Sequence, residues 1–208
     1  MLSVDISDEP HRRAAAHIAR RISDARGAFH LALSGGKTPA VMIRALDVHA
    51  PRLHVWQVDE RVVPEDHPSR NVGMIRRNLN IPCVLHPMPV DADDADVRYA
   101  QELLRIAGGT LDLVQLGLGP DGHTASLVPG DPVLDVTDRD VAFAGPYDGT
   151  RRLTMTYPTL NRARERVWLV VGADKAEALQ RLLASDRSIP AGRLPPEGIV
   201  FADSAATR

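Results

Sequence analysis

The segment Asp112-Leu-Val-Gln-Leu-Gly-Leu-Gly-Pro-Asp-Gly-His-Thr-Ala-Ser-Leu-Val-Pro-Gly130 decides how this chain folds. It continues an apolar run, 111–118, whose length is typical of a buried parallel strand. Glycines and a proline then turn the chain, and the turn carries one carboxylate, Asp121, and one imidazole, His123. Because sites in open α/β sheets lie beyond the carboxyl ends of the strands, this turn is the first candidate site. The alternative is that Asp121 caps a helix and His123 is a surface residue.

Composition limits the class of protein. A chain of 208 residues, 44% hydrophobic, is long enough for one full core, so we expect a single domain over 1–208. A net charge of -2 and 4% aromatic residues argue against a nucleic-acid partner. The single cysteine, Cys83, excludes a disulfide framework and a cysteine-based zinc site within one chain. Without a long apolar run or a signal-peptide pattern in 1–11, we expect a cytoplasmic protein with no membrane partner.

Apolar periodicity predicts helices and strands in alternation. The expected helices are 10–26, 40–46, 71–79, 94–106, 159–164 and 175–184. The expected strands are 29–33, 54–58, 84–88, 111–118, 141–144, 167–171 and 198–202, with 151–156 as an edge or turning strand and 131–140 as a polar loop. This alternation is typical of the α/β class and predicts a doubly wound, largely parallel sheet.

The segment Ser34-Gly-Gly-Lys-Thr38 joins an expected strand to an expected helix. Its glycines let the backbone approach a ligand, and the helix start offers free N–H groups and the positive end of its dipole. Two hydroxyls and an ammonium complete a phosphate cradle. The spacing is not that of a Walker A loop, and an ordinary strand–helix turn is the alternative. The candidate substrate-binding residues here are Ser34, Gly35, Gly36, Lys37 and Thr38.

Polar residues follow three further expected strands: Asp59-Glu60-Arg61, the Asp121 turn, and Gly172 to Lys175. Because the carboxyl ends of parallel strands share one edge, we expect these groups to meet the phosphate cradle. A solvated loop is the alternative for the charged triplet. The acidic run 91–96 lacks the Gly and Glu of an EF-hand loop and better fits the start of a helix, so we expect no metal site.

These motifs resemble those of the 6-phosphogluconolactonase family, which is related to the glucosamine-6-phosphate deaminases/isomerases. The matching segments cover nearly the whole chain in the family's order: Leu33 to Pro39, Val58 to Pro64 with Asn71, Gly117 to Gly130, Arg152 to Thr154, Val171 to Lys175, and Ile189 to Ala191. The resemblance implies a Rossmann-like three-layer fold without a cofactor. It also implies hydrolysis of 6-phospho-D-glucono-1,5-lactone in the oxidative pentose phosphate pathway.

The resemblance further implies roles for individual residues. His123 resembles the family's catalytic histidine, with Asp121 as its neighbour, and residues 35–38 resemble the phosphate loop. Groups that resemble the lining of the sugar-phosphate pocket are Arg61, Asn71, Arg152 and Lys175, to which we add Asp59, Gly119 and Gly122 from the same motifs. Arg70 stands where the family often has serine, so it is expected either to add a phosphate contact or to displace the usual one.

As a mechanism, we expect a neutral His123 to take a proton from the water that attacks the lactone carbonyl. Turn N–H groups in 119–122 are expected to face the oxyanion. The cations expected to hold the phosphate are Lys37, Arg70, Arg152 or Lys175. The expected partner is a small sugar phosphate, and the expected assembly is a monomer or small homo-oligomer.

Three alternatives stay open. A serine hydrolase is the first, because Ala32-Leu-Ser-Gly-Gly36 is close to a nucleophile elbow. A deaminase or isomerase is the second, and it is disfavoured because Val128 stands where those enzymes carry a glutamate. A non-catalytic sugar-phosphate sensor is the third.

Overall fold

The main sheet of the computed structural model, which describes all 208 residues, has seven strands, all of them parallel. Their order is β1-β10-β9-β6-β2-β3-β5. The strands are β1 (Leu2–Ile6), β2 (Phe29–Leu33), β3 (Leu53–Gln57), β5 (Val84–His86), β6 (Leu113–Leu116), β9 (Arg166–Val170) and β10 (Gly198–Ala202). Every residue of β2, β6 and β9 is buried, as the apolar runs predict.

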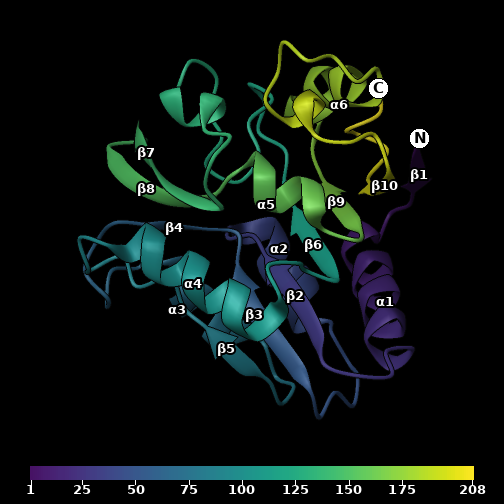
Figure 1. Ribbon diagram of the computed structural model, residues 1–208. Helices are drawn as coiled ribbons and strands as arrows, with labels where there is room; N and C mark the ends of the chain where they lie inside the picture. The colour runs from purple at the N-terminus through teal and green to yellow at the C-terminus, as the bar shows by residue number, and fades with distance from the viewer.

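Helices cover both faces of this sheet, which gives the three layers visible in Figure 1. The helices are α1 (Pro10–Ser23), α2 (Lys37–Arg44), α3 (Asn71–Asn78), α4 (Ala95–Ala107), α5 (Tyr157–Arg162) and α6 (Ala176–Leu183). Alternate strand residues enter different cores: Leu31 and Leu33 pack with α1, α2 and α3, whereas Ala32 packs with α4, α5 and α6. The predicted α/β class and doubly wound parallel sheet are therefore confirmed.

The chain reverses its direction of winding between β2 and β6. From β2 it continues outward to β3 and β5, and from β6 it continues the other way to β9 and β10. The loops that leave two neighbouring strands toward opposite sides open a crevice at their carboxyl ends. Here those loops are the Ser34 segment and the His123 turn.

A second, antiparallel sheet was not predicted. It consists of β4 (Asp59–Arg61), β8 (Thr150–Met155) and β7 (Val141–Tyr147), in the order β4-β8-β7. The sequence predicts a loop for the residues of β4 and an edge or turning strand for 151–156, whereas β8 is the central strand of this sheet. β4 is too short to show a period, and its partner lies far along the chain, so no local pattern reports the pairing.

Other differences are at the ends of elements. α1 ends at Ser23 instead of residue 26, and β6 keeps only the middle of the apolar run. The 131–140 segment contains a short 3-10 helix, Pro132–Asp135, in which the Asp131 side chain accepts from Val133 N at 2.8 Å. β1 was missed because it is an edge strand with two of its side chains in intermediate exposure and the rest exposed.

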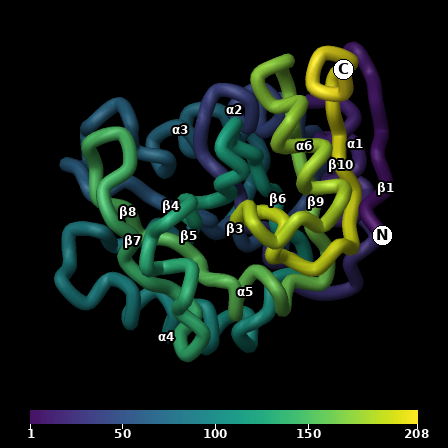
Figure 2. The backbone as a smooth tube through the Cα atoms, turned by 90° about the horizontal axis from the view of Figure 1, so that it is seen from above, coloured from purple at the N-terminus to yellow at the C-terminus, as the bar shows by residue number.

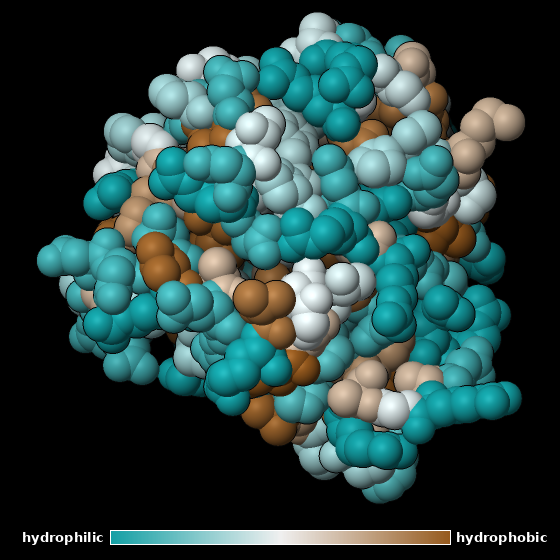
Figure 3. All heavy atoms as spheres, in the orientation of Figure 1, coloured by the Kyte–Doolittle hydropathy of each residue, from teal (hydrophilic) through white to brown (hydrophobic).

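The chain's first and last strands lie side by side at one edge of the sheet (Figure 2). The face of the molecule in Figure 3 is largely hydrophilic, with apolar atoms in small separate groups; Val97 and Leu104 of α4 are among the exposed large apolar residues. None of the helices combines the length and apolar character that crossing a bilayer requires.

Candidate active site

A cavity of about 390 Å³ opens at the carboxyl ends of the central strands. Loops after β2, β6 and β9 line it together with residues of β4 and the β7–β8 hairpin. The predicted site residues in its wall are Ser34, Gly35, Gly36, Lys37, Thr38, Asp59, Arg61, Asn71, Gly119, His123, Arg152 and Lys175. The four strand ends singled out in the sequence therefore meet in one place.

His123 is held by the turn that carries it. Its Nδ1 lies 2.6 Å from Asp121 Oδ1, and its backbone N donates to the same oxygen at 3.1 Å. A carboxylate only accepts hydrogen bonds, so in the neutral imidazole the proton lies on Nδ1 and Nε2 keeps a free lone pair. Burial alone would raise the pKa of Asp121, but the hydrogen bonds and charge of His123 outweigh it and lower that pKa. Asp121 therefore stays ionised and orients a base.

Gly119 explains how the imidazole fits against the turn. A Cβ on Gly119 would lie 2.1 Å from His123 Nδ1 and 2.6 Å from Asp121 Oδ1. Only a residue without a side chain lets the ring lie that close to the backbone. Gly119 lines the cavity as predicted, and the structure adds that it makes room for the imidazole.

Two N–H groups of residues 119–122 are used within the turn. Gly119 N donates to His123 O at 2.9 Å, and Gly122 N donates to Gly119 O at 3.0 Å. The expectation that these N–H groups face an oxyanion is therefore wrong for Gly119 and Gly122. Gly122 was also predicted to be a site residue, but it does not line the cavity. Its φ is +80°, and a Cβ there would lie 2.5 Å from Ile189 Cβ. Its carbonyl accepts a hydrogen bond from Ala191 N at 3.0 Å. It fixes the 189–191 loop against the turn.

Ser34 is not placed as a nucleophile. It is 5% exposed, and its Oγ donates to Gln115 O at 2.9 Å while its backbone N donates to Gln115 Oε1 at 3.2 Å. These bonds fasten the loop after β2 to β6. The side-chain contacts of the His123 ring are with Asp121 and Tyr147, so the serine-hydrolase alternative lacks its base.

The start of α2 forms one wall of the cavity. Gly36 precedes the helix with a φ of +112°, a conformation that favours glycine, and Lys37, Thr38 and Pro39 of the first turn line the cavity. The first N–H groups of a helix have no partner within it and carry its positive dipole end. This wall suits a phosphate group.

Asp59 and Asn71 join the other loops to this wall. Asp59 is 6% exposed; one carboxylate oxygen accepts from Ser126 Oγ at 2.6 Å and the other from Asn71 Nδ2 at 3.2 Å. Asn71 lies directly on Gly35, where a Cβ would fall 1.7 Å from its Oδ1. Asp59 and Asn71 therefore set the spacing between the loop after β2 and the His123 turn.

Two guanidinium groups face the cavity from paired strands. Arg61 of β4 is the register partner of Arg152 of β8, and both line the cavity. Burial, and then the nearby charge of Arg61, lower the pKa of Arg152. Two partly desolvated cations side by side favour an anion between them. Lys175, whose side chain is 22% exposed, adds a further cation and pairs with Asp174 at 3.0 Å.

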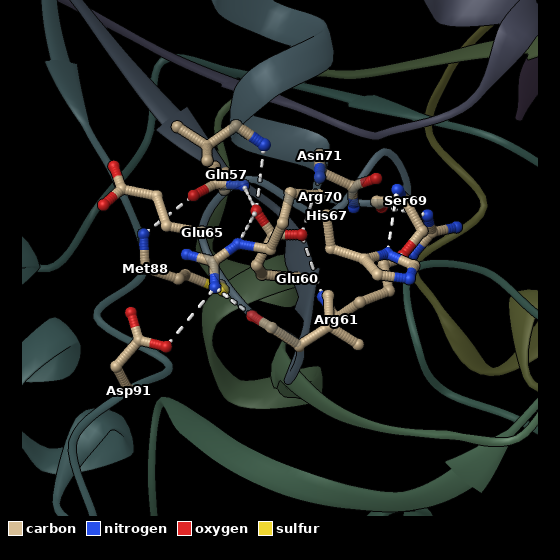
Figure 4. A network of polar contacts seen from close by, with 12 residues as sticks. Gln57, Glu60, Arg61, Glu65, His67, Ser69, Arg70, Asn71, Met88 and Asp91 are labelled. Atoms are coloured by element: carbon tan, nitrogen blue, oxygen red, sulfur yellow. Dashed lines mark hydrogen bonds and ion pairs between the residues drawn. The ribbon is translucent and has the colours of Figure 1, made fainter.

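Arg70 does not reach the cavity, so its predicted phosphate contact is wrong. It is 4% exposed, and its Nη1 donates to Val63 O at 2.6 Å and lies 3.6 Å from Asp91 Oδ1. Figure 4 shows it against the carboxylate of Glu60, with 3.5 Å between Arg70 Nε and Glu60 Oε2. Arginine at this position serves a buried network on the far side of Asn71.

Glu60 is the centre of that network and is fully buried. Its carboxylate accepts from Asn71 N at 2.7 Å, Val72 N at 2.9 Å and Gln57 Nε2 at 2.7 Å (Figure 4). A carboxylate on the first N–H groups of α3 satisfies donors that have no partner in the helix. Glu60 therefore fixes the helix start from which Asn71 reaches the cavity.

Sequence reasoning missed the cavity residues of the β7–β8 hairpin, Tyr147 and Asp148. Asp148 and Gly149 have φ values of +49° and +74°, which fits the Asp-Gly pair of a tight hairpin turn. An Asp-Gly pair between two apolar segments is a strong hairpin signal, so the turn was detectable in the sequence. The placing of Tyr147 beside His123 was not, because it depends on the second sheet.

No group of three or more His, Cys, Asp or Glu side chains is arranged to hold a metal ion. In the acidic run 91–96, Asp94 pairs with Arg98 at 2.6 Å, and Asp91 lies near Arg70.

The chain is similar to known proteins over nearly all of its length. The family described as glucosamine-6-phosphate isomerases/6-phosphogluconolactonase matches residues 6–201. The chain belongs to this family. A 6-phosphogluconolactonase of Synechocystis sp. is 41% identical over 89% of this chain and 87% of the relative, and one of Rattus norvegicus is 35% identical over 88% and 81%. Among solved structures, the 6-phosphogluconolactonase of Thermotoga maritima superposes with a TM-score of 0.87 at 26% identity, covering 98% of this chain and all of that one.

Proposed function

We propose that this chain is a 6-phosphogluconolactonase, which hydrolyses 6-phospho-D-glucono-1,5-lactone to 6-phospho-D-gluconate in the oxidative pentose phosphate pathway. The observation that carries the mechanism is the 2.6 Å contact between His123 Nδ1 and Asp121, which leaves Nε2 as a free base in a cavity lined by cations. The relatives named above, whose names state this activity, support the reaction.

His123 acts as a proton shuttle in this mechanism. Nε2 takes a proton from a water molecule while the water oxygen bonds to the lactone carbonyl carbon. When the tetrahedral intermediate collapses, the bond from that carbon to the ring oxygen breaks, and the imidazolium returns the proton to the ring oxygen. Asp121 stabilises the imidazolium between these two steps. General acid–base help of this kind contributes about 10²–10⁴-fold to the rate.

The phosphate supplies positioning. A phosphate dianion at the start of α2 would be neutralised by Lys37 or by the paired Arg61 and Arg152. Lys175 lines the same cavity. Holding the substrate at a group that does not react turns remote binding into orientation of the carbonyl near His123.

The direct test follows the opening of freshly generated 6-phosphogluconolactone with and without the protein, corrected for the spontaneous rate. We expect saturable acceleration. A rate equal to the spontaneous one, with 6-phosphogluconate still bound, would show a sugar-phosphate sensor instead. Release of ammonia from glucosamine 6-phosphate would show a deaminase, which Val128 disfavours because valine cannot transfer a proton.

A substitution separates phosphate binding from chemistry. Lys175→Ala should raise KM by about 10-fold or more, because a charge-assisted hydrogen bond contributes about 1.5–3 kcal/mol, and it should change kcat less. Arg105→Ala removes a cation from the exposed surface of α4 and serves as the control for loss of positive charge. An unchanged KM in the Lys175 variant would contradict its place in the binding site.

We also propose that the enzyme works in the cytoplasm as a monomer or small homo-oligomer without a nucleic-acid partner. The net charge of -2 and the absence of a membrane-crossing helix support this proposal. Cell fractionation and sedimentation velocity test it.

A further inference from the structure

Tyr147 is the cavity residue that lies against His123 and that the mechanism has not used. It ends β7 at the tip of the β7–β8 hairpin, and its ring is edge-on to the imidazole, with ring centroids 5.0 Å apart and an interplanar angle of 61°. Its hydroxyl oxygen lies 3.5 Å from His123 Nδ1. The hydroxyl therefore meets the imidazole on the same nitrogen that Asp121 binds.

The turn alone restrains His123 incompletely. The side chains of His123 and Asp121 are 23% and 36% exposed, and one hydrogen bond to Nδ1 leaves the ring free to rotate about that bond. The Gly119 backbone closes one approach to the ring. The Tyr147 ring makes a further contact, from an element that is not part of the turn. A large aromatic side chain restricts a neighbouring ring at low entropic cost, because it has only two rotatable bonds.

Tyr147 is itself held in place by a cation of the cavity. Arg152 Nη2 donates to Tyr147 O at 2.8 Å, Arg152 Nε donates to Thr150 O at 3.2 Å, and the guanidinium lies 5.7 Å from the Tyr147 ring centroid. The Asp148-Gly149 turn, with both residues at positive φ, fixes the direction in which the hairpin ends. The same arginine that lines the cavity thus braces the residue that packs on His123.

We propose that Tyr147 is a positioning residue for His123, and that the Arg152 side chain, which donates to the main-chain carbonyl of Tyr147, ties the geometry of the base to the anion-binding wall. The proposal rests on the proposed role of His123 as the proton shuttle. The ring of Tyr147 restrains the imidazole, and its hydroxyl affects the Nδ1–Asp121 pair. Burial, and then the charges of Asp121 and Asp148, raise the pKa of Tyr147, so the hydroxyl is an uncharged phenol at neutral pH.

Two variants separate the ring from the hydroxyl. Tyr147→Ala removes both and should lower kcat by about 10–100-fold with KM changed little, because a misplaced catalytic group loses about this much. Tyr147→Phe keeps the ring and should recover most of that loss, while shifting the acid limb of the pH profile. Tyr157→Phe is the matched control: its hydroxyl donates to Pro190 O at 2.9 Å outside the cavity wall, so kcat and the pH profile should stay as in the wild type.

An NMR titration of the His123 imidazole gives a readout that does not depend on turnover. The resonances are assigned by their loss in His123→Ala, and we expect the pKa of His123 and the exchange broadening of its ring signals to change in both Tyr147 variants. A wild-type titration and wild-type kcat in Tyr147→Ala would overturn the proposal. So would a raised KM with an unchanged titration, which would make Tyr147 a substrate contact. If the wild type lacks lactonase activity, the proposed function fails, and the titration still decides whether Tyr147 positions His123.

Discussion

Histidines of this protein lie in two opposite settings, one at the cavity and one within the main sheet. At the carboxyl ends of the strands, His123 faces the cavity with Asp121 on one ring nitrogen. The second group, which we call the histidine column, consists of His30 of β2, His54 of β3 and His86 of β5. In the column, His54 Nδ1 lies 3.0 Å from His86 Nε2, and His86 Nδ1 lies 2.6 Å from Glu102 Oε1.

The imidazole rings of the column pack in the protein interior as aromatic side chains do. Trp56 stacks on His86 at a centroid distance of 3.9 Å and donates its Nε1–H to His30 Nδ1 at 3.3 Å. Both nitrogens of His86 are engaged inside the protein, whereas His123 keeps Nε2 free. Residue type alone therefore says little about chemistry. A histidine becomes a base when the fold occupies one nitrogen and leaves the other facing a cavity.

Substituting one histidine from each setting gives the largest expected difference in kcat. His123→Ala should lower kcat by about 10²–10⁴-fold with KM little changed and the free energy of unfolding within about 0.5 kcal/mol of the wild type. His54→Gln should instead lower the thermal midpoint and leave kcat nearly unchanged. Steady-state kinetics and calorimetry on both variants check the comparison, and wild-type turnover by His123→Ala would reject the proposed base.

Gly119→Ala tests whether the backbone next to His123 sets the position of its imidazole. The added Cβ would lie 2.1 Å from His123 Nδ1, so the imidazole must move, and kcat should fall by about 10²-fold. Gly27→Ala is the matched control, because a Cβ at Gly27 has no neighbour within 4 Å. A crystal structure of the Gly119 variant with the ring unmoved, or wild-type kcat, would contradict this reading of the turn.

Acidic pH should lower the stability of the folded protein through the histidine column. Burial first, and then a neighbouring histidine, lower the pKa of His30 and His54 below the usual 6.5. At low pH the unfolded chain therefore binds more protons than the folded chain. The contribution of these two histidines to the free energy of unfolding is complete above pH 6.5 and is lost as the pH falls below that value. Urea unfolding at pH 7.5 and 5.5 should show a lower midpoint at the acidic pH.

A variant assigns that loss to the column. His54→Asn should reduce the difference between the two midpoints, and His49→Asn, which changes an exposed histidine outside the column, should leave it unchanged. Equal midpoints for the wild type at both pH values would show that the column does not control acid stability.

The smallest effect concerns backbone strain, which the site has and the column lacks. Ala125 and Asp148 both have positive φ and both line the cavity. The left-handed conformation destabilises alanine by about 1–2 kcal/mol, and glycine loses about 0.5–1 kcal/mol of that gain to chain entropy. Ala125→Gly should therefore raise the free energy of unfolding by up to about 1 kcal/mol, or about 2–4 °C in Tm. A lower Tm would show that the Ala125 methyl stabilises the site.

Much of the main sheet could be predicted because most of its strands are apolar runs, and β2, β6 and β9 are buried along their whole length. β10 was expected over its observed residues, and the alternation of strands and helices predicts the doubly wound class, whereas the strand order comes from the structure. The second sheet could not, because β4 carries the polar triplet Asp59-Glu60-Arg61 and shows its character only when paired with β8.

The candidate site divides in the same way. Residues in the strand–turn–helix motifs were located from their local pattern, and the cavity gathers them. Arg70 was misplaced because a charged side chain beside a binding motif resembles a ligand contact, and only the fold shows that Glu60 and Val63 engage it. Tyr147 was overlooked because its neighbour His123 lies 24 residues earlier. Local pattern reports which element a residue occupies, and distant pairing decides what it touches.

The edge pairing of β1 with β10 has a consequence for how the molecule is assembled. Five register pairs, from Leu2↔Gly198 to Ile6↔Ala202, join two strands that are far apart in the sequence. During synthesis from the N-terminus, β1 leaves the ribosome long before β10, the strand it pairs with. This border of the sheet therefore closes only after β10 has been made, and nascent chains halted before β10 should keep residues 2–6 open to proteases.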